Sequence, residues 1–313
     1  MHCCLQPRIP IAYRLSSRTA MTTDSPDLPA LVPPLLALCK VAGDEICAHY
    51  QAPGAHQYQA KGDDSPLTQA DLASHRLLSE GLAGLAPDLP VLSEESTEQE
   101  KAQRHDWPVF WMVDPLDGTK EFLARTGEFT INIALIVDHR PVLGLIYLPL
   151  QSQAYVGIPG KWARLYGMAD QTMTQLSTRS FEPQRPLTVL ASRRHRGSRL
   201  QACLDWLEHH WGEIQRDNSG SALKFCQLAA GEGDIYPRYS PCCEWDTAAG
   251  QALLEAAGGA LLGLDGKPLQ YNCRGTLLSP HFIALGDPGH SLSQQVLAME
   301  KAAGHQDEKN TCT

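Results

Sequence analysis

An apolar run, Val109–Val113, leads directly into Asp114–Thr119, which reads Asp-Pro-Leu-Asp-Gly-Thr. The β-branched and aromatic residues of the run predict a buried strand. The chain is expected to leave the sheet and turn after Asp114, because proline fixes one backbone dihedral and glycine permits conformations that other residues avoid. Such a turn can direct two carboxylates and a backbone carbonyl at one point, which is the ligand set that hard divalent cations prefer.

Further acidic residues occur where other predicted elements begin or end. Glu94 follows the short strand 91–93, Asp71 lies three residues after Thr68 on a predicted helix, and Asp246 opens another helix. Taken singly, each has a structural explanation: a tight Asp-Gly turn, a solvated Glu94-Glu95 loop or a helix N-cap. Together, four acidic clusters suit phosphoryl transfer with two or three metal ions.

Charge and hydropathy limit the classes of partner. The formal net charge of -9 over 313 residues argues against a dedicated nucleic-acid binder. Every apolar run is shorter than the roughly 18 residues needed to cross a bilayer, so no transmembrane segment is expected. The 10 cysteines include no C-x-x-C pair and are expected to be reduced thiols in a cytoplasm.

The N-terminal segment 1–28 is expected to be a disordered extension or an overlong start, with Met21 as the alternative first residue. Its arginines superficially resemble a transit peptide, but prolines break the only apolar stretch.

Periodicity divides the rest of the chain into an N-terminal α+β half at 29–180, a C-terminal α/β half at 181–290 and a partly disordered tail at 291–313. The polar stretch 167–186 marks the boundary. In the first half, helices are expected at 31–50 and 68–85, and strands at 91–93, 109–113, 129–137, 142–148, 154–157 and 161–166. In the second half, strands are expected at 187–191 and 234–238, helices at 198–211, 221–230 and 246–257, and a hairpin at 260–264 around Asp265-Gly266.

Three segments resemble the signature blocks of the inositol monophosphatase superfamily: Leu92–Ser96, Asp114–Phe122 and Trp245–Gly250. The resemblance runs from about residue 31 to about residue 285. It implies the layered αβαβα sandwich of that superfamily, with the metal cluster between the two halves.

Within the superfamily, the chain most resembles the CysQ-type 3'(2'),5'-bisphosphate nucleotidases. The segments that carry this closer resemblance are Asp117–Phe122, Gly220–Cys226 and Tyr236–Arg238. It implies magnesium-dependent hydrolysis of adenosine 3',5'-bisphosphate (PAP) to AMP and phosphate by a metal-activated water, and also of 3'-phosphoadenylyl sulfate (PAPS) to adenylyl sulfate (APS), in sulfur metabolism. Lithium inhibition is implied by the same resemblance.

The resemblance also implies the metal ligands. Two Mg²⁺ ions, or three, would be held, with Asp114 bridging two of them and Asp71 serving the weakest. The implied ligands are Glu94, Asp114, the carbonyl of Leu116, Asp117, Asp246 and Asp71. Thr119, beside Glu94 and Asp71, would polarise the attacking water, and Gly118 and Thr119 would donate to the phosphate. Leu116, Asp117 and Asp246 would also border the substrate.

On the nucleotide side, Ser221, Lys224 and Arg238 match positions that contact the ribose, the base or the non-scissile phosphate, and His195 is a further candidate. Without the resemblance, Lys224 and Arg238 could equally be a helix-surface lysine and a strand-end arginine. Lys61 and Lys120 are weaker candidates, and His209-His210 are expected to be surface residues.

Glu244 departs from the small or amide residue that related nucleotidases often have before Trp-Asp. It either crowds the metal site or faces solvent, and the second is expected because neighbours on an extended segment point to opposite sides.

Two other functions remain open. An inositol or sugar monophosphatase would share the metal ligands without needing the nucleotide-side cations, and a nucleotide-binding regulator would keep the fold without turnover. The expected location is the cytoplasm, with peripheral attachment at the cytoplasmic face of the inner membrane as an alternative. The sequence does not predict an oligomeric state.

Overall fold

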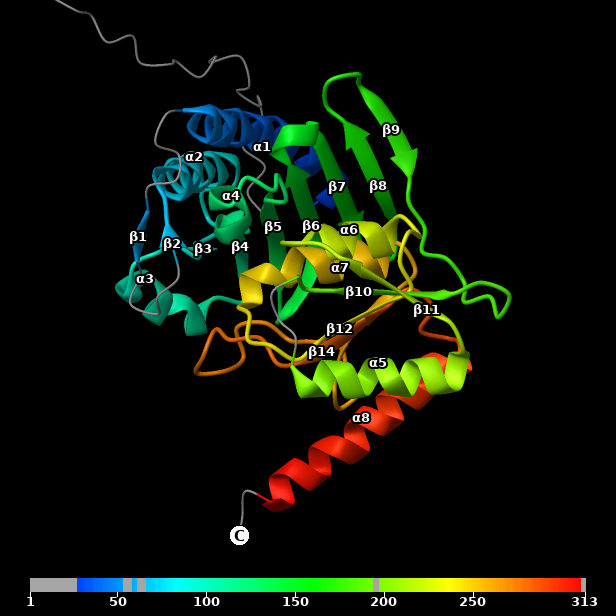
Figure 1. Ribbon diagram of the computed structural model, residues 1–313. Helices are drawn as coiled ribbons and strands as arrows, with labels where there is room; N and C mark the ends of the chain where they lie inside the picture. Colours follow the sequence, from blue (N-terminus) through cyan, green and yellow to red (C-terminus); the bar gives the residue numbers. More distant parts are fainter. Residues whose placement is uncertain (1–26, 53–57, 61–65, 194–196, 311–313) are drawn as a thin grey trace, which may run out of the picture.

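Helices and two β-sheets alternate in αβαβα layers (Figure 1). The computed structural model describes residues 27–52, 58–60, 66–193 and 197–310. The expected layered sandwich is confirmed. Its helix layers are α1 (Leu28–Gln51) with α2 (Gln69–Leu85), then α6 (Leu223–Ala229) with α7 (Ala248–Ala256), and finally α5 (Ser198–Trp211) with α8 (Ser291–Asn310).

The larger sheet has seven strands in sequence order, of which β3 and β4 pair in parallel and the later neighbours are antiparallel. The antiparallel pair expected at 129–137 and 142–148 is present as β5 and β6. The strands are β3 (Val91–Ser93), β4 (Val109–Asp117), β5 (Thr130–Val137), β6 (Arg140–Leu148), β7 (Gln153–Ile158), β8 (Trp162–Gly167) and β9 (Thr172–Gln175).

Strand β4 is buried on both faces, which explains its uninterrupted apolar sequence. Trp111 and Val113 pack into the core under α1 and α2, whereas Phe110 and Met112 point into the layer that contains α6 and α7. Each of these side chains is at most 1% exposed. The strand therefore carries Asp114, the residue after Val113, into the interior of the protein.

The smaller sheet has the order β11-β10-β12-β14-β13, with β10 parallel to both of its neighbours. Because β10 and β12 are parallel, the residues that follow β10 and those that end β12 lie at the same edge of the sheet. The strands are β10 (Leu187–Ala191), β11 (Ile214–Asn218), β12 (Ile235–Arg238), β13 (Ala260–Gly263) and β14 (Phe282–Leu285).

Helix α7 lies against the larger sheet at two glycines. A Cβ atom on Gly144 of β6 would be 2.3 Å from the carbonyl oxygen of Ala249, and one on Gly157 of β7 would be 2.4 Å from Cα of Leu253. Only glycine permits so close an approach of backbone to backbone. The two glycines thus fix α7, and with it Asp246 just before α7, relative to the larger sheet.

Several strands differ from the sequence-based expectations, and β14 was not predicted. β4 continues to Asp117 instead of ending at Val113, because β5 keeps pairing with it beyond an irregularity between Asp114 and Asp117. β9 lies inside the polar stretch 167–186, and its four residues are exposed, so no apolar pattern marks it. β11 was not predicted. β13 pairs mainly with β14, and the hairpin expected at 260–264 is reduced to one bridge between Leu262 and Pro268.

The remaining differences concern the ends and the first connection. A short ribbon of β1 (Gln59–Ala60) and β2 (Pro66–Leu67) precedes the first predicted strand. The segment expected to be a tail forms α8, whose Leu292 and Val296 are buried against α5. The extension predicted at 1–28 lies outside the described residues up to residue 26. The boundary at residue 180 stays a prediction, and α7 of the second half packs against β6 and β7 of the first.

Among the described residues, no helix is long and apolar enough to cross a membrane. The described cysteines carry free thiols.

Replacing Gly144 by alanine should force α7 away from the sheet. We expect Gly144→Ala to lower the free energy of unfolding by about 1–3 kcal/mol, the usual cost of overpacking. Urea unfolding followed by circular dichroism measures the change. The matched control is Gly84→Ala in α2, where an added Cβ meets nothing within 4 Å. A Gly144→Ala protein as stable as this control would contradict the packing described here.

Candidate active site

The end of β4 is tied down by buried polar contacts. Asp114 is 1% exposed, and its Oδ1 accepts a hydrogen bond of 3.0 Å from the backbone N of Leu116. The Leu116 side chain is buried in the core under α1 and α2. Ser74 of α2 donates to the carbonyl oxygen of Pro115 at 2.7 Å. These contacts therefore hold the backbone of Pro115 and Leu116, within the irregularity of β4.

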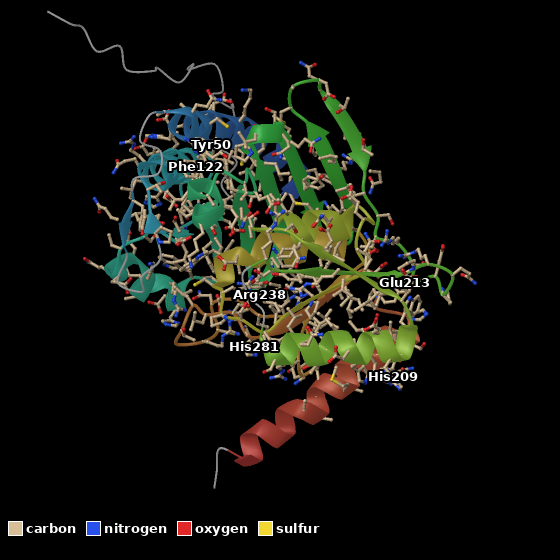
Figure 2. All side chains as sticks on the ribbon, in the orientation of Figure 1. Tyr50, Phe122, His209, Glu213, Arg238 and His281 are labelled. Atoms are coloured by element: carbon tan, nitrogen blue, oxygen red, sulfur yellow. The ribbon has the colours of Figure 1, made fainter. Side chains whose placement is uncertain are left out.

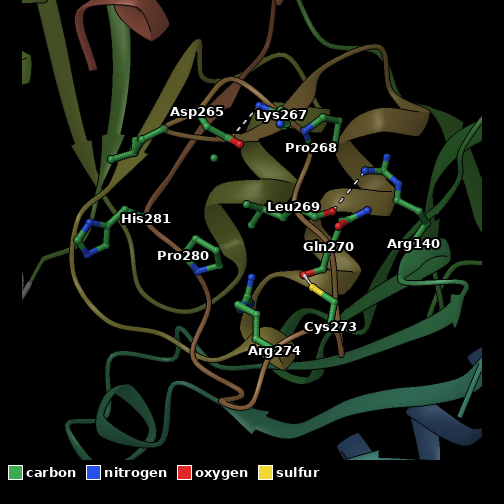
Figure 3. A pocket seen from close by; sticks show the side chains of 12 residues that line it. Arg140, Asp265, Lys267, Pro268, Leu269, Gln270, Cys273, Arg274, Pro280 and His281 are labelled. Atoms are coloured by element: carbon green, nitrogen blue, oxygen red, sulfur yellow. Dashed lines mark hydrogen bonds between the residues drawn. The ribbon is translucent and has the colours of Figure 1, made fainter. Parts of the chain in front are cut away.

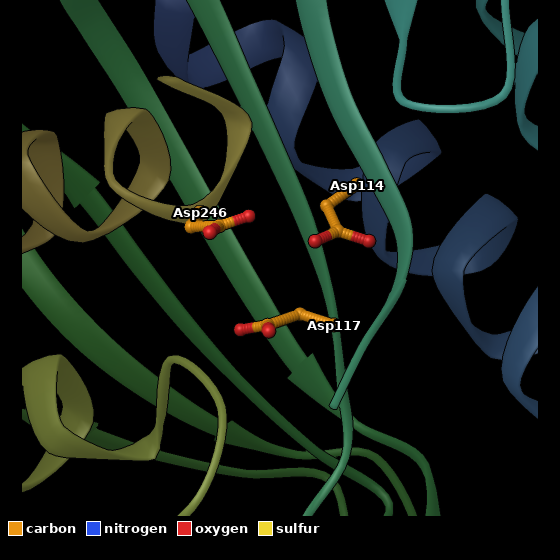
Figure 4. Close-up of side chains that lie close together, drawn as sticks. All are labelled: Asp114, Asp117 and Asp246. Carbon is orange, nitrogen blue, oxygen red and sulfur yellow. The ribbon is translucent and has the colours of Figure 1, made fainter. Parts of the chain in front are cut away.

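Three carboxylates converge at this point (Figure 4). Asp114 and Asp117 come from β4, and Asp246 ends the 3₁₀ turn η4 (Glu244–Asp246) just before α7. One oxygen of each lies within 4.8 Å of the others. Asp117 accepts from the side-chain amide of Asn132 at 3.3 Å, and Asp246 accepts from the backbone N of Cys243 at 3.0 Å.

Burial, and to a smaller extent the charge of Glu94, raise the pKa of all three carboxyl groups. Burial raises the pKa of Asp114 well above its usual range, and the charges of Glu94, Asp117 and Asp246 raise it further. Burial likewise raises the pKa of Asp117 to about 6 and that of Asp246 to about 8. Charges so close together in the interior are unfavourable unless a cation compensates them.

Glu94 belongs to the same electrostatic cluster. It follows β3, and its backbone N donates to the carbonyl oxygen of Val113 on the parallel strand β4 at 3.0 Å. Its charge contributes to the raised pKa of Asp71 and of each of the three converging aspartates.

Thr119 and Asp71 form a hydrogen-bonded pair beside the carboxylates. The Thr119 hydroxyl lies 3.1 Å from Oδ1 of Asp71 and 3.3 Å from the carbonyl oxygen of Leu116. Asp71 is 2% exposed, and its other oxygen accepts from the backbone N and the hydroxyl of Thr68 at 2.8 and 2.5 Å. The capping box of α2 thus fixes the orientation of Asp71.

An aromatic cluster anchors the short helix α4 (Thr119–Leu123) that begins at Thr119. Phe122 is 1% exposed and its ring centroid lies 5.1 Å from that of Tyr50 and 5.3 Å from that of Phe129 (Figure 2). The Phe122 side chain therefore packs in the core, and it joins α4 to the end of α1 and the start of β5.

A cavity of about 120 Å³ begins at the carboxylates and extends toward the smaller sheet. Its walls combine two of the aspartates with cationic and aromatic side chains. They comprise Asp117, Lys120, Glu121, Ser192, Arg193, Gly220, Ser221, Lys224, Phe225, Tyr236, Arg238, Cys242, Asp246, Thr247 and Phe282.

Lys224 is buried in the cavity wall with 2% exposure, so the alternative of a helix-surface lysine is wrong. Its Nζ donates to the carbonyl oxygens of Ser219 and Ser221 at 2.9 and 2.8 Å and lies 5.2 Å from the ring centroid of Tyr236. Burial and the charge of Arg238 lower the pKa of Lys224 to about 8.

Arg238 ends β12, as expected of a strand-end arginine, and it also lines the cavity. Its guanidinium donates to the carbonyl oxygens of Ser240 and Pro241 at 3.2 and 3.1 Å and to the hydroxyl of Tyr236 at 3.2 Å. These bonds hold the cation in place before any ligand binds.

Ser221 and Gly118 meet at the junction of the two halves. Ser221 has a φ of 42°, and its buried Oγ has no hydrogen-bond partner among the described residues. Gly118 has a φ of 93°, and a Cβ there would lie 2.8 Å from the carbonyl oxygen of Glu128 and 3.3 Å from Cβ of Ser221. Only glycine satisfies both the dihedral and the close contact.

A second, larger cavity of about 840 Å³ lies elsewhere (Figure 3). It contains none of the converging carboxylates. Its lining residues are Arg140, Gly263, Leu264, Asp265, Lys267, Pro268, Leu269, Gln270, Cys273, Arg274, Pro280 and His281.

A sequence model of the inositol monophosphatase family matches residues 30–299. The chain belongs to the inositol monophosphatase family. The 3'(2'),5'-bisphosphate nucleotidases CysQ of Salmonella typhimurium and Escherichia coli K12 are 43% and 42% identical to this chain, in each case over 78% of this chain and 95% of the relative. Among solved structures, CysQ from Bacteroides thetaiotaomicron, described as a bacterial member of the inositol monophosphatase family, has a TM-score of 0.70 and 34% identity over 81% of this chain and 96% of its own.

Members of this family depend on metal ions, and the acidic cluster fits that requirement. Buried Asp114 and partly buried Asp117 and Asp246 converge with raised pKa values, and all offer the hard oxygen atoms that Mg²⁺ prefers. Of the proposed ligands, Asp114, Asp117 and Asp246 form a group whose carboxylate oxygens lie within 4.8 Å of one another.

The structure does not describe two of the candidate residues, and it decides the predicted exposure of His209, His210 and Glu244. Lys61 and His195 lie outside the described residues. The predicted surface position of His209 and His210 is confirmed, since both are exposed on α5, and Figure 2 shows His209 away from Arg238. The prediction that Glu244 faces solvent is wrong: it is 1% exposed, because the segment forms a 3₁₀ turn that directs this side chain inward.

Sequence reasoning missed several residues that support the site. Asn132, which binds Asp117, was visible as a polar residue in an otherwise apolar strand. Ser74 lies three residues after Asp71, on the same helix face. Arg193 follows β10 and pairs with Glu128, whose other oxygen accepts from the backbone N of Gly220 at 2.8 Å. No local sequence pattern indicated this last arrangement.

The raised pKa values predict a pH-dependent stability of the metal-free protein. Asp117 (about 6) and Asp246 (about 8) keep protons in the folded state that the unfolded chain has released, since their ordinary value is 3.8. The free energy of unfolding should therefore fall as pH rises from 5 to 8, by on the order of 2 kcal/mol. Urea unfolding in the presence of a chelator measures it.

Saturating Mg²⁺ should remove most of this slope, because ions then replace the protons. An Asp246→Asn control should also show a smaller slope without metal. A slope that neither Mg²⁺ nor this substitution changes would show that other groups cause it.

Proposed function

We propose that this chain hydrolyses the 3'-phosphate of PAP to give AMP and phosphate, and that it also converts PAPS to APS. The observation that carries the proposal is the 43% identity to a CysQ nucleotidase over 95% of that relative's length. The cavity supports it, because buried Lys224 and partly buried Arg238 line it together with two of the aspartates and suit a substrate with a second anionic group. This reaction belongs to sulfur metabolism.

Mg²⁺ is the proposed cofactor, with two ions and a third at a weaker position. Bound Mg²⁺ supplies Lewis-acid stabilisation of phosphate charge and activates the attacking water. The third ion would lie near Asp71. The proposed ligands of the first two are Glu94, Asp114, the carbonyl oxygen of Leu116, Asp117 and Asp246.

Thr119 and Asp71 orient the water. Because the Thr119 hydroxyl donates its proton to Asp71, its lone pairs are left to accept a hydrogen bond from the water. The water oxygen forms a bond to phosphorus while the bond from phosphorus to the 3' oxygen breaks. The water gives up a proton and the 3' oxygen gains one. Because water itself attacks phosphorus, no covalent enzyme intermediate forms. Gly118 and Thr119 contact the scissile phosphate.

Lys224, Arg238 and Ser221 form the nucleotide side, with His195 as a further candidate. Since Nζ of Lys224 already binds two carbonyl oxygens, its main effects are a fixed positive charge and a fixed position for Ser221. The Ser221 hydroxyl, which lacks a partner among the described residues, is a suitable donor to the ribose or a phosphate.

Cytoplasmic location is proposed from the substrate. Peripheral attachment to the inner membrane has no support in the described structure, and lithium inhibition stays a prediction.

A substrate comparison tests the reaction. With Mg²⁺, kcat/KM for PAP should exceed that for inositol 1-phosphate by roughly 100-fold or more, because the inositol ester leaves the cationic wall unpaired. Phosphate release measures both rates. Arg238→Ala should reduce the rate with PAP and leave the low rate with inositol 1-phosphate unchanged. The reverse preference would establish the inositol or sugar monophosphatase alternative instead.

Asp117→Asn separates an enzyme from a nucleotide-binding regulator. Loss of this carboxylate should lower kcat with PAP by about 1000-fold, since it removes a proposed metal ligand. The matched control is Asp205→Asn on the exposed face of α5, which should keep the wild-type rate. Equal phosphate release by wild type and Asp117→Asn would show that a contaminating protein causes the activity. The assignment of this chain as an enzyme would then fail.

A further inference from the structure

Glu244 is a buried carboxylate two residues before Asp246, and its contacts point away from the acidic cluster. Oε1 accepts a hydrogen bond of 2.7 Å from Nη2 of Arg274, and Oε2 accepts one of 2.7 Å from the backbone N of Asn272. With 1% exposure, Glu244 depends on these two partners to offset the cost of burying its charge.

The partners of Glu244 are fixed in turn by Arg104, which follows α3 (Glu98–Gln103) and is 3% exposed. Its Nη1 donates to Oδ1 of Asn272 at 2.7 Å, and its Nη2 donates to the carbonyl oxygens of Arg274 and Gly275 at 2.9 and 3.1 Å. The side-chain amide of Asn272 returns a bond to the carbonyl oxygen of Arg104 at 2.5 Å. The larger-sheet half thus holds the segment 272–279 through a buried arginine.

Segment 272–279 also binds the backbone around η4. The backbone N of Glu244 donates to the carbonyl oxygen of Leu277 at 2.8 Å, and the backbone N of Ser279 donates to the carbonyl oxygen of Cys242 at 2.8 Å. The carbonyl oxygen of Glu244 accepts from the Thr247 hydroxyl at 3.1 Å. Cys242 and Glu244 are therefore both attached to segment 272–279, which acts as a strap on the start of η4.

Asp246 needs such an anchor. The charges of Asp117 and Glu94 repel it, and its carboxylate accepts a hydrogen bond from the neighbouring backbone N of Cys243. A 3₁₀ turn has three residues per turn, so side chains two apart point in different directions. Glu244 can therefore bind the strap while Asp246 faces the other carboxylates.

We propose that Glu244 is a positioning residue, which fixes η4 through Arg274 and Asn272 and so holds the Asp246 carboxylate at the metal site. The proposal rests on the proposed metal role of Asp246. Glu244 itself contacts neither metal nor substrate. Outer contacts of this kind orient ligands, and their loss usually costs about 10–100-fold in metal affinity.

The direct test is Mn²⁺ binding to the free protein, measured by electron paramagnetic resonance without substrate. Glu244→Ala should bind Mn²⁺ about 10–100-fold more weakly than wild type. The Mg²⁺ concentration for half-maximal phosphate release should rise similarly, while KM for PAP at saturating Mg²⁺ changes less than about twofold.

The matched control is Glu255→Ala. Glu255 lies on α7 and pairs with Arg140 at 2.9 and 3.0 Å, so this change also removes a glutamate–arginine pair but leaves η4 untouched. It should lower the unfolding midpoint and keep wild-type Mn²⁺ affinity. If Glu244→Ala does not fold, Glu244→Gln retains an acceptor for Asn272 and removes only the charge, and it should bind Mn²⁺ about 3–10-fold more weakly.

Mn²⁺ affinity within about twofold of wild type in a folded Glu244 variant, whatever the loss of stability, would overturn the proposal. Tighter binding would also overturn it, since Glu244 would then act by crowding the metals. If the wild-type protein does not hydrolyse PAP, the proposed function fails, yet the Mn²⁺ titration still decides the role of Glu244.

Discussion

The repulsion among carboxylates at the end of β4 is the constraint on which this structure depends. Oxygen atoms of Asp114, Asp117 and Asp246 lie within 4.8 Å of one another, and burial and the charge of Glu94 raise the pKa of each. Such an arrangement persists only when the surroundings hold it in place. Backbone N atoms and the Asn132 amide bind these carboxylates and limit their movement apart, and Ser74 holds the intervening backbone.

The fold meets this constraint by bringing two rigid elements together from distant parts of the sequence. β4 lies between β3 and β5 in a sheet that is covered on both faces, so its end has little freedom to move. α7 is pressed against that sheet at Gly144 and Gly157, which places η4 beside β4. The carboxylates therefore keep their spacing because whole layers, rather than a single loop, would have to shift to change it.

Local patterns predicted most regular elements, whereas long-range contacts decided what was missed. The strand 187–191 and the helix 198–211 were predicted to the residue, since apolar periodicity marks them. β9 is exposed along its length, so the pattern is absent. Glu244 was placed wrongly because its partners, Asn272 and Arg274, lie in a distant segment. The acidic residues of the site were recognised through three sequence blocks, but their spacing and the burial of Lys224 required the folded chain.

Lys224 links the acidic cluster to the nucleotide side of the cavity. Asp117 raises the pKa of Lys224, and Lys224 lowers that of Asp117, so each charge stabilises the other. A divalent cation bound at Asp117 would weaken this support and favour loss of the lysine proton, whose pKa is already about 8. An anionic substrate in the cavity would restore the support. Since linkage between binding events is reciprocal, a cation that favours neutral Lys224 and a substrate that favours protonated Lys224 oppose each other through this lysine. Binding of both together therefore depends on the direct attraction between the cation and the anionic substrate outweighing that opposition.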